Sequence, residues 1–256
     1  MTEKTNTTQN VRAVTRALAI LNSFAGKGLQ SLAEVTQGTG LDKGTTRRLL
    51  LTLMESGFIA QDPTTQHYRL GRAVRDLAAN VADDLDLRGI ALPVMAELAA
   101  DLHITAFISV YNEGDVVCVE RIHDMKGIEV HWWAVGGTLP YNCGGAPKLL
   151  LAYQPAQEIN RVLKRVPVAM TPKSVTDVEE LRDQLEKIRR RGWECAVDDV
   201  SLGLTALAVP VRDRNGEIVC CISMAGLTPQ MISRGRPVHL ARLQSAAEQI
   251  ERRLKR

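Results

Sequence analysis

The chain has 256 residues, of which 45% are hydrophobic, and a formal net charge of +3. This length and apolar content are sufficient for two ordinary domains, each with its own core. No uninterrupted apolar stretch reaches the roughly 18 residues that a membrane helix needs. Residues 1–10 are polar and unlike a secretory or organellar leader, so the sequence predicts a cytoplasmic protein with a disordered tail at residues 1–10.

The five cysteines are odd in number, lack CxxC spacing and follow no export signal, which is typical of reduced cytosolic thiols. A metal site built from Cys143, Cys195 and His131 stays open as an alternative. No pair of potential ligands has the short spacing of structural zinc motifs, however. We therefore predict neither a metal site nor a cofactor.

The charge is unevenly distributed along the chain. Residues 1–72 carry nine Lys and Arg against five acids, a net charge of +4, which leaves −1 for the remainder. A protein that binds DNA must gather its positive charges on the part of the structure that meets the phosphates. A small basic domain joined to a nearly neutral larger one therefore favours polyanion binding by the first domain.

The first predicted element is an amphipathic helix. Its apolar residues recur at helical spacing until glycines stop the pattern, and such a stripe normally faces a core. The stripe consists of Val11, Val14, Leu18 and Leu21, with Phe24 one turn further on.

Two short helices joined by a tight glycine turn follow. Ser31 and Glu34 form a capping box for the first, and Asp42 stands at the N-cap position of the second. The inward face of the second helix is predicted to consist of Thr46, Leu49, Leu50 and Leu53. Because basic residues lie off this face in the first two turns, the pair is typical of a helix-turn-helix whose second helix enters the major groove.

Residues 58–61 and 67–70 can pair as strands around the turn at residues 62–65, which predicts the wing of a winged helix-turn-helix. The residues predicted to contact DNA are Lys43, Gly44, Thr45, Arg47, Arg48, Thr65 and His67. The alternative is a three-helix packing unit whose arginines only solvate a surface. The predicted wing and the excess of basic residues together favour a DNA-binding unit.

The second part of the chain alternates strands and helices. A linker helix is predicted over residues 73–87, after which two β-hairpins, at residues 104–122 and 205–226, enclose a strand at 127–135 and a glycine-containing loop at 141–148. Further helices are predicted at residues 148–152, 155–164, 178–191 and 237–254, the third of them with Thr176 and Glu179 as a capping box. The fold class is therefore α+β, with a DNA-binding domain at residues 11–72, the linker helix, and a second domain at residues 88–256.

The sequence lacks the familiar catalytic signatures. It contains no phosphate-binding GxxxxGK[ST], no dinucleotide GxGxxG, no GxSxG and no HExxH, and His123 has no nucleophile placed beside it. A sheet flanked by helices without a catalytic constellation favours holding a ligand over transforming it. Two alternatives remain: an enzyme or ligand-storage protein whose N-terminal helices only oligomerise, and an architectural DNA binder without an effector.

Several blocks resemble the IclR family of transcriptional regulators over nearly the whole chain. They are RALAILNSF, SLAEVTQGTGLDKGTTRRLLLTLMESGFIAQD, HYRLG, LPYNCGGAPKLLLA and RRRGWECAVDDVSLGLTALAVPVRDRNGEIVCCISMAG. The resemblance implies a GAF-like effector domain, homodimers or homotetramers, and a small organic effector. It also implies a recognition helix at residues 43–55 with Arg48 as the characteristic arginine. Gly44 and Thr46 depart from the family pattern, which has a serine and an aliphatic residue there.

The resemblance also implies an effector pocket, built from the strand before the glycine loop, that loop and the two final strands. Its predicted residues are Val130, Trp132, Thr138, Gly144, Gly145, Asp199, Leu204, Ala206, Ser223 and Ala225. Backbone N–H groups of Gly144 and Gly145 and the Ser223 hydroxyl suit a carboxylate, and hence an acidic effector.

Trp132 and Trp133 are adjacent, so only one of them can face the pocket if they lie in a strand. Parity with Val130 favours Trp132 and, with it, an aromatic effector. The alternative is that both tryptophans are core or interface residues.

These predictions combine into a transcription regulator that is not an enzyme and has no membrane partner. It is expected to bind double-stranded operator DNA, as a repressor rather than an activator, under the control of a small organic acid. Two recognition helices of a dimer would enter successive major grooves, and the linker helix would transmit the effect of the ligand.

Overall fold

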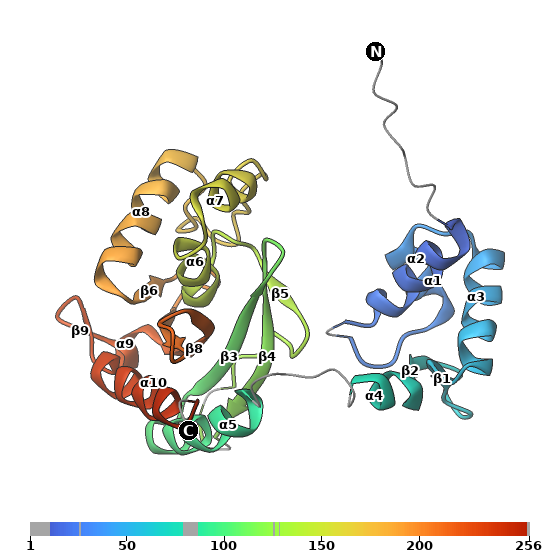
Figure 1. Cartoon of the computed structure of the whole chain (residues 1–256), viewed down its shortest axis with the longest axis horizontal. Helices are drawn as coiled ribbons and strands as arrows, with labels where there is room; N and C mark the ends of the chain where they lie inside the picture. The colour runs from blue at the N-terminus through green and yellow to red at the C-terminus, as the bar shows by residue number, and fades with distance from the viewer. Residues whose placement is uncertain (1–10, 26, 79–86, 125, 128, 255–256) are drawn as a thin grey trace, which may run out of the picture. The chain divides into compact units, whose positions relative to one another are not determined.

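The computed structural model describes residues 11–25, 27–78, 87–124, 126–127 and 129–254. The chain divides into two compact units, Met1–Asp83 and Asp84–Arg256 (Figure 1). The predicted tail at residues 1–10 and residues 79–86 of the predicted linker helix lie outside the described residues. The finer boundaries that the sequence predicts between the domains stay predictions.

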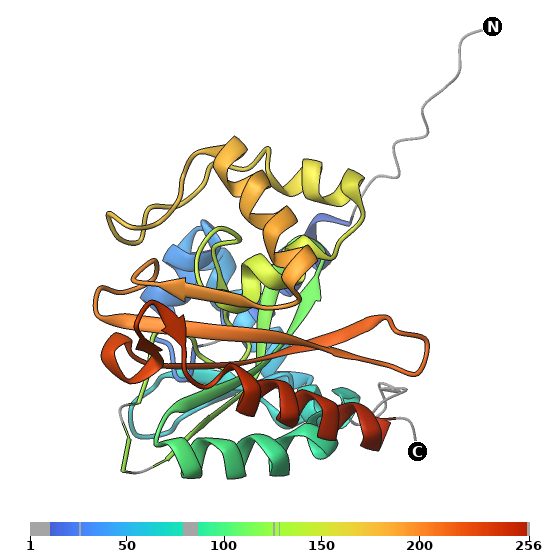
Figure 2. The ribbon, with the colours of Figure 1, turned by 90° about the vertical axis from the view of Figure 1, so that its left-hand side faces the viewer.

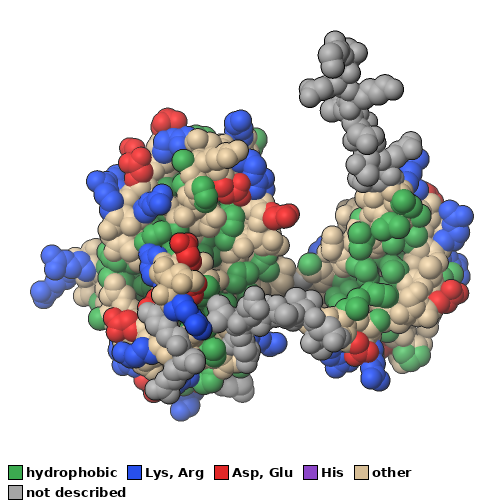
Figure 3. All heavy atoms as spheres, viewed as in Figure 1, with side chains coloured by type: hydrophobic (Ala, Val, Ile, Leu, Met, Phe, Trp, Pro, Cys, Tyr) green, Lys and Arg blue, Asp and Glu red, His purple; other side chains and the backbone are tan. Residues whose placement is uncertain are grey.

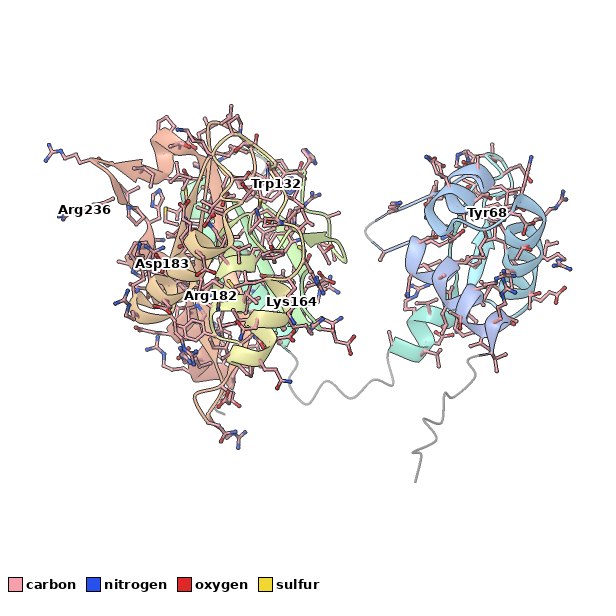
Figure 4. The ribbon with its side chains drawn as sticks, turned by 90° about the horizontal axis from the view of Figure 1, so that it is seen from above. Tyr68, Trp132, Lys164, Arg182, Asp183 and Arg236 are labelled. Atoms are coloured by element: carbon pink, nitrogen blue, oxygen red, sulfur yellow. The ribbon has the colours of Figure 1, made fainter. Side chains whose placement is uncertain are left out.

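The first unit is a winged helix-turn-helix, as predicted. Its elements are α1 (Arg12–Ser23), α2 (Leu32–Thr39), α3 (Lys43–Glu55), β1 (Ile59–Gln61), β2 (Tyr68–Leu70) and α4 (Arg72–Ala78). The two strands pair antiparallel, with Gln61 opposite Tyr68. The core consists of Ile20, Phe24, Val35, Leu50, Ile59 and Tyr68, the last of which Figure 4 labels. One small core thus joins α1, α2 and α3 to the wing.

The predicted caps of α2 and α3 are confirmed. The Ser31 hydroxyl accepts a hydrogen bond from the Glu34 N–H, and Glu34 Oε2 accepts one from the Ser31 N–H at 2.7 Å. Asp42 Oδ1 accepts a hydrogen bond from the Thr45 N–H at 2.9 Å. These bonds to backbone N–H groups lower the pKa of both carboxyl groups. They fix where each helix begins, and therefore the angle at which α3 leaves the turn.

The predicted inward stripe of α1 is mostly wrong. Val11, Val14 and Leu18 are 66%, 55% and 53% exposed, whereas Ile20 and Phe24 are buried. Figure 3 shows the apolar side chains gathered on one face of this unit. The helix has two apolar faces, and helical periodicity alone does not say which of them meets the core of its own unit.

The second unit contains one six-stranded antiparallel sheet in the order β5-β4-β3-β8-β7-β6. Its strands are β3 (Thr105–Asn112), β4 (Asp115–His123), β5 (Thr138–Leu139), β6 (Glu194–Val197), β7 (Leu204–Arg212) and β8 (Ile218–Leu227). The two predicted hairpins are β3-β4 and β7-β8, and they join through β3 and β8. A smaller motif follows: α9 (Thr228–Met231), β9 (Ile232–Ser233) and β10 (Arg236–Pro237).

Helices cover both faces of this sheet (Figure 2). One face carries α5 (Leu87–Leu102) and α10 (Leu240–Leu254); the other carries α6 (Gly145–Ala152), α7 (Ala156–Val162) and α8 (Val178–Arg191). Alternate strand residues point to the two sides, so that Leu207 and Ile222 meet the first pair while Ala208 and Cys221 meet the other group. The predicted α+β class with a mainly antiparallel sheet is confirmed. No helix in the described ranges is long and apolar enough to cross a membrane.

Two local predictions are wrong. The expected strand at residues 127–135 is a loop wherever the structure describes it, because the Val130 N–H donates to the Thr105 hydroxyl at 2.9 Å instead of to a strand. The edge of β4 is instead paired further along, where Gly136 and Gly137 hydrogen-bond to Cys118. Helix α8 is capped by Asp177, whose Oδ1 accepts the Glu180 N–H at 2.8 Å, rather than by the predicted box one residue earlier.

Candidate DNA interface and effector site

Helix α3 has one anchored face and one free face. Thr46 and Leu50 are fully buried, and the Thr46 hydroxyl donates to the Asp42 carbonyl at 2.9 Å. The predicted inward role of Thr46 is thereby confirmed, and its hydroxyl has a partner. Lys43, Arg47 and Arg48 are exposed and form no ion pair with the other described residues. Unpaired cations on a rigid helix are the groups that contact phosphates and base edges.

The outer face of α3 also has room at Gly44. A Cβ added there would lie 3.3 Å from Asp42 Oδ1 and would meet no backbone atom. Gly44 lies one turn before Arg48, so both lie on the side of the helix away from Thr46. The predicted contacts of α3 therefore share one accessible surface, to which Thr45 contributes from its edge.

The wing is held by its own turn. Asp62 Oδ1 accepts hydrogen bonds from the Thr65 N–H at 2.7 Å and from the Thr65 hydroxyl at 3.0 Å, and both bonds lower the pKa of Asp62. His67 Nδ1 lies 2.9 Å from the Thr65 carbonyl oxygen. The Thr65 hydroxyl is thus engaged in the turn, whereas Nε2 of the half-buried His67 forms no hydrogen bond with the described residues. The direct DNA contacts of both residues stay predictions.

Sequence reasoning missed two residues around the wing. Gln30 is 3% exposed and exchanges two backbone hydrogen bonds with Tyr68, at 2.9 and 2.7 Å, which adds a third chain segment to the hairpin. Arg69 is exposed on β2, next to the buried Tyr68. The alternation of a strand could have placed Arg69 outward, but the burial of a glutamine in a loop leaves no signal in the sequence.

The structure brings most of the predicted effector residues to one face of the large sheet. Ala206 lies opposite Ala225, and Ser223 lies between Phe107 and Ala208 in neighbouring strands. Leu204 is on the same side as Ala206, because alternate residues of β7 share a face. Gly145 packs directly on this face, since an added Cβ would lie 3.0 Å from the Ala208 Cβ.

Val130 also lies near this face. Its N–H donates to the hydroxyl of Thr105, and Thr105 lies opposite Ala225 in the neighbouring strand.

Two predicted effector residues are placed differently. Thr138 is exposed in the edge strand β5, which β4 and β3 separate from β8. The Gly144 N–H donates to Asp199 Oδ2 at 3.1 Å, so this donor is already engaged. The Gly145 N–H, in contrast, has no acceptor among the described residues and stays available to a ligand carboxylate.

The tryptophans do not follow strand parity. Trp133 is 3% exposed, and its indole N–H donates to the Gly137 carbonyl at 3.0 Å. Trp132 is half-buried, and both rings contact Phe107, with centroids 6.2 Å away for Trp132 and 5.6 Å away for Trp133. The parity argument is wrong because the segment is a loop. Trp132 Nε1 is nevertheless buried without a hydrogen-bond partner among the described residues, and Figure 4 labels its position.

A buried charge cluster that the sequence did not predict lies beneath the glycine loop. Lys148 Nζ is 2.9 Å from Glu194 Oε1 and 3.0 Å from Asp199 Oδ2, and all three residues are at most 5% exposed. Burial alone would lower the pKa of Lys148, but the two carboxylates more than offset it and the pKa is raised. Asp199 therefore joins Lys148 to the Gly144 N–H.

The five cysteines are free thiols, four of them buried and Cys195 half-buried. Burial raises the pKa of Cys195 to about 11 and that of Cys118 to about 12, and Cys143 donates a weak hydrogen bond to the Val168 carbonyl. Within the described ranges, no group of His, Cys, Asp and Glu could hold a metal ion.

Comparison with known proteins agrees with this architecture. The model of the bacterial transcriptional regulator IclR C-terminal domain matches residues 79–252, and the IclR helix-turn-helix domain matches residues 13–63. The HTH-type transcriptional regulator KipR of Bacillus subtilis is 25% identical over 244 residues, which cover 95% of this chain and 97% of KipR. The transcriptional repressor IclR of Escherichia coli is 26% identical over 223 residues, which cover 86% of this chain and 81% of that protein.

Solved structures share the fold. An IclR homolog complexed with 4-hydroxybenzoate, from Microbacterium hydrocarbonoxydans, has a TM-score of 0.82 at 23% identity and covers 94% of this chain and 98% of its own. An IclR transcriptional regulator from Alicyclobacillus acidocaldarius has a TM-score of 0.78 at 26% identity and covers 95% and 99%. These relatives are transcriptional regulators and not enzymes. The chain therefore belongs to the IclR family of transcriptional regulators and carries that family's helix-turn-helix DNA-binding domain.

Proposed function

We propose that the protein is a cytoplasmic, homo-oligomeric repressor whose affinity for operator DNA is controlled by a small organic acid. The observation that carries the proposal is the division of α3 into a face locked in the core and a face with three unpaired cations, Lys43, Arg47 and Arg48. Such a helix can enter a major groove without rearrangement and without first breaking ion pairs.

The exposed stripe of α1 supports pairing of the DNA-binding units. Val11, Val14 and Leu18 are exposed at helical spacing, and Figure 3 shows a hydrophobic patch on this unit. Exposed apolar patches of this kind mark contacts with partners. A second copy of the same helix is the proposed partner, which would place two recognition helices on a pseudo-palindromic operator. Sedimentation of the full chain distinguishes a dimer from a tetramer.

The proposed effector site lies on the sheet face at Ser223, Ala225, Ala206 and Gly145. The Ser223 hydroxyl and the Gly145 N–H supply polar contacts to a carboxylate. An aromatic acid is favoured because Phe107 and Trp132 bring ring surfaces to the same face, with the Trp132 N–H free to donate. The Microbacterium homolog, which binds 4-hydroxybenzoate, and the repressors among the relatives point in the same direction.

The first test is binding of the purified full chain to the DNA upstream of its own gene, titrated against salt and against unrelated DNA of equal length. We expect specific binding that weakens with salt, because released counterions dominate the affinity. Equal affinity for both DNAs would contradict sequence-specific recognition of that region, and no binding at low salt would refute the DNA-binding role.

The effector is tested with the same protein. A panel of aromatic and aliphatic carboxylic acids, 4-hydroxybenzoate among them, is screened for a rise in melting temperature, since a ligand that binds only the folded state stabilises it. A hit must also change operator affinity, because a ligand with equal affinity for both DNA-binding states changes nothing. An acid that stabilises the protein and leaves operator binding unchanged would contradict the regulatory proposal.

A further inference from the structure

A cavity lies at the edge of the sheet, between α8 and the edge strand β6. Its volume is about 260 Å³, and of the predicted effector residues only Asp199 lines it. Helix α8 lies beside β6 in Figure 1, and the strands that carry the proposed effector site lie further inside the sheet. The cavity is thus distinct from the proposed effector site, and its chemistry is different.

The floor of this cavity is made of charges that compensate each other. Lys148 is held by Glu194 and Asp199, as described above. The Arg191 guanidinium hydrogen-bonds to Glu194 and to the Trp193 carbonyl, the latter at 2.7 Å, and it stacks 4.2 Å from the centre of the Trp193 ring. These contacts hold the arginine rigidly at the mouth of the cavity.

The rim, in contrast, carries charges without counterions. Lys173, from the loop before α8, and Lys187, from α8 itself, are exposed and form no ion pair with any other described residue. With four cations and two carboxylates, the lining has a net charge of +2. A cavity with this excess of positive charge attracts anions.

A polar atom without a partner lies in the same lining. Gln184 Oε1 is buried and accepts no hydrogen bond among the described residues, whereas its Nε2 lies 3.5 Å from Glu180 Oε1. A buried carbonyl oxygen without a donor costs free energy unless a ligand or water supplies the donor. The cavity therefore offers cations for a negatively charged group and one acceptor for a hydroxyl hydrogen.

We propose that this cavity binds a small dianion that carries a hydroxyl group, namely hydrogen phosphate or a hydroxylated phosphate monoester. The two negative charges match the excess of Lys173 and Lys187, Arg191 adds planar donors suited to phosphate, and the hydroxyl donates to Gln184. The cavity is large enough for a phosphate group with a short substituent. This second site has its own lining, and the proposal does not depend on the identity of the effector.

The experiment is calorimetric titration of the full chain with inorganic phosphate, and with sulfate as the matched anion. Sulfate has the size and charge of hydrogen phosphate but no hydroxyl hydrogen at neutral pH. We expect one phosphate site per chain and about tenfold weaker binding of sulfate, the value of one hydrogen bond to a buried acceptor. K173Q and K187Q should each weaken phosphate binding about tenfold, whereas K164Q, at an exposed lysine outside this cavity, should leave it unchanged.

A further variant separates the two parts of the proposal. Q184M removes the acceptor at similar volume, so phosphate should lose its advantage over sulfate while both still bind. The proposal is overturned by the absence of saturable phosphate binding, by unchanged affinity in K173Q and K187Q, or by equal affinities of the wild-type protein for both anions. Operator binding by K187Q is measured in parallel, and we expect it to be retained, so that failure here is distinguishable from failure of the proposed regulatory function.

A third titration, with a phosphate monoester, distinguishes free phosphate from a phosphorylated metabolite as the ligand. Glycerol phosphate carries both the dianion and free hydroxyls, and its affinity relative to inorganic phosphate shows which of the two the cavity prefers. Either preference supports the proposal, because both ligands share the chemistry that the lining recognises.

Discussion

Replacing Lys148 with methionine is expected to destabilise the second unit strongly. The ammonium group is 2.9 Å from Glu194 and 3.0 Å from Asp199, and neither of these two residues is more than 5% exposed. Methionine fills a similar volume but leaves both carboxylates without this cation. Glu194 keeps Arg191 and Asp199 keeps the Gly144 N–H, so the loss is partial for each.

The magnitude follows from the behaviour of buried ion pairs. Removing one partner from such a pair costs about 3–5 kcal/mol, because an uncompensated charge stays buried. In a unit of this size, each kcal/mol lowers the melting temperature by about 2–4 °C, so we expect a decrease of roughly 6–20 °C. The folded pKa of Lys148 is raised, so its contribution is fully present below the unfolded value of about 10.4 and is lost only above the folded pKa. The difference should therefore be constant between about pH 7 and pH 9.

Differential scanning calorimetry of the full chain measures this effect, with the melting of each unit followed separately. The matched control is Lys164→Met, the same substitution at an exposed lysine, which should change stability by less than about 0.5 kcal/mol. A combined Lys148→Met, Glu194→Gln and Asp199→Asn variant should recover much of the loss, since no buried charge is then stranded in the cluster. A single-variant loss below about 1 kcal/mol would refute the reasoning, because the cluster would then contribute no more than a surface ion pair.

The remaining predictions concern DNA, assembly and the effector. Arg48→Ala should weaken operator binding by about 1–3 kcal/mol in anisotropy titrations while Arg189→Ala, at an exposed arginine of α8, does not; equal effects would remove α3 from the interface. Leu18→Glu should weaken self-association by about 1–2 kcal/mol per buried leucine without lowering the melting temperature, as sedimentation and calorimetry would show; unchanged association would exclude α1 from the dimer contact. Trp132→Phe should weaken binding of an acidic effector about tenfold while an uncharged aromatic analogue binds as before, and an unchanged affinity for the acid would mean that the indole N–H makes no contact.

Local signals in the sequence predicted much of the fold. The capping residues Ser31 and Asp42 act through bonds within one turn of helix, so their sequence spacing is sufficient to place them. The same is true of the two hairpins, because turn residues and alternating strands are neighbours in the chain. The recognition helix and the wing followed from these elements and from the resemblance to a family.

Features that depend on distant parts of the chain were not predictable. The segment at residues 129–135 is rich in Val and Trp, as strands are, but the Val130 N–H finds its partner in the side chain of Thr105, 25 positions earlier. The apolar residues of α1 recur at helical spacing, but no local signal says whether such a stripe packs in the core of its own unit or stays on the surface. Lys148 was predicted as the junction of the glycine loop and a helix but not as part of a charge cluster, because its two carboxylates are contributed by residues more than forty positions later.

Asp199 connects the two proposed ligand sites. One carboxylate oxygen, Oδ2, accepts from the Gly144 N–H at 3.1 Å and lies 3.0 Å from Lys148 Nζ, which lines the phosphate cavity. A dianion that attracts the Lys148 ammonium weakens the ion pair between Lys148 and Asp199. The hydrogen bond that Asp199 accepts from the glycine loop beside the effector site is then held less firmly.

If both sites are occupied as proposed, phosphate should therefore change effector affinity, and by linkage the effector should change phosphate affinity by the same factor. Titrating each ligand in the presence and absence of the other measures both factors; we expect a change of about fivefold or more, typical of coupled sites. Because Asp199→Asn weakens both bonds, it should reduce the coupling while K164Q preserves it. Independent affinities in the wild-type protein would show that the shared carboxylate supports the fold without coupling the sites.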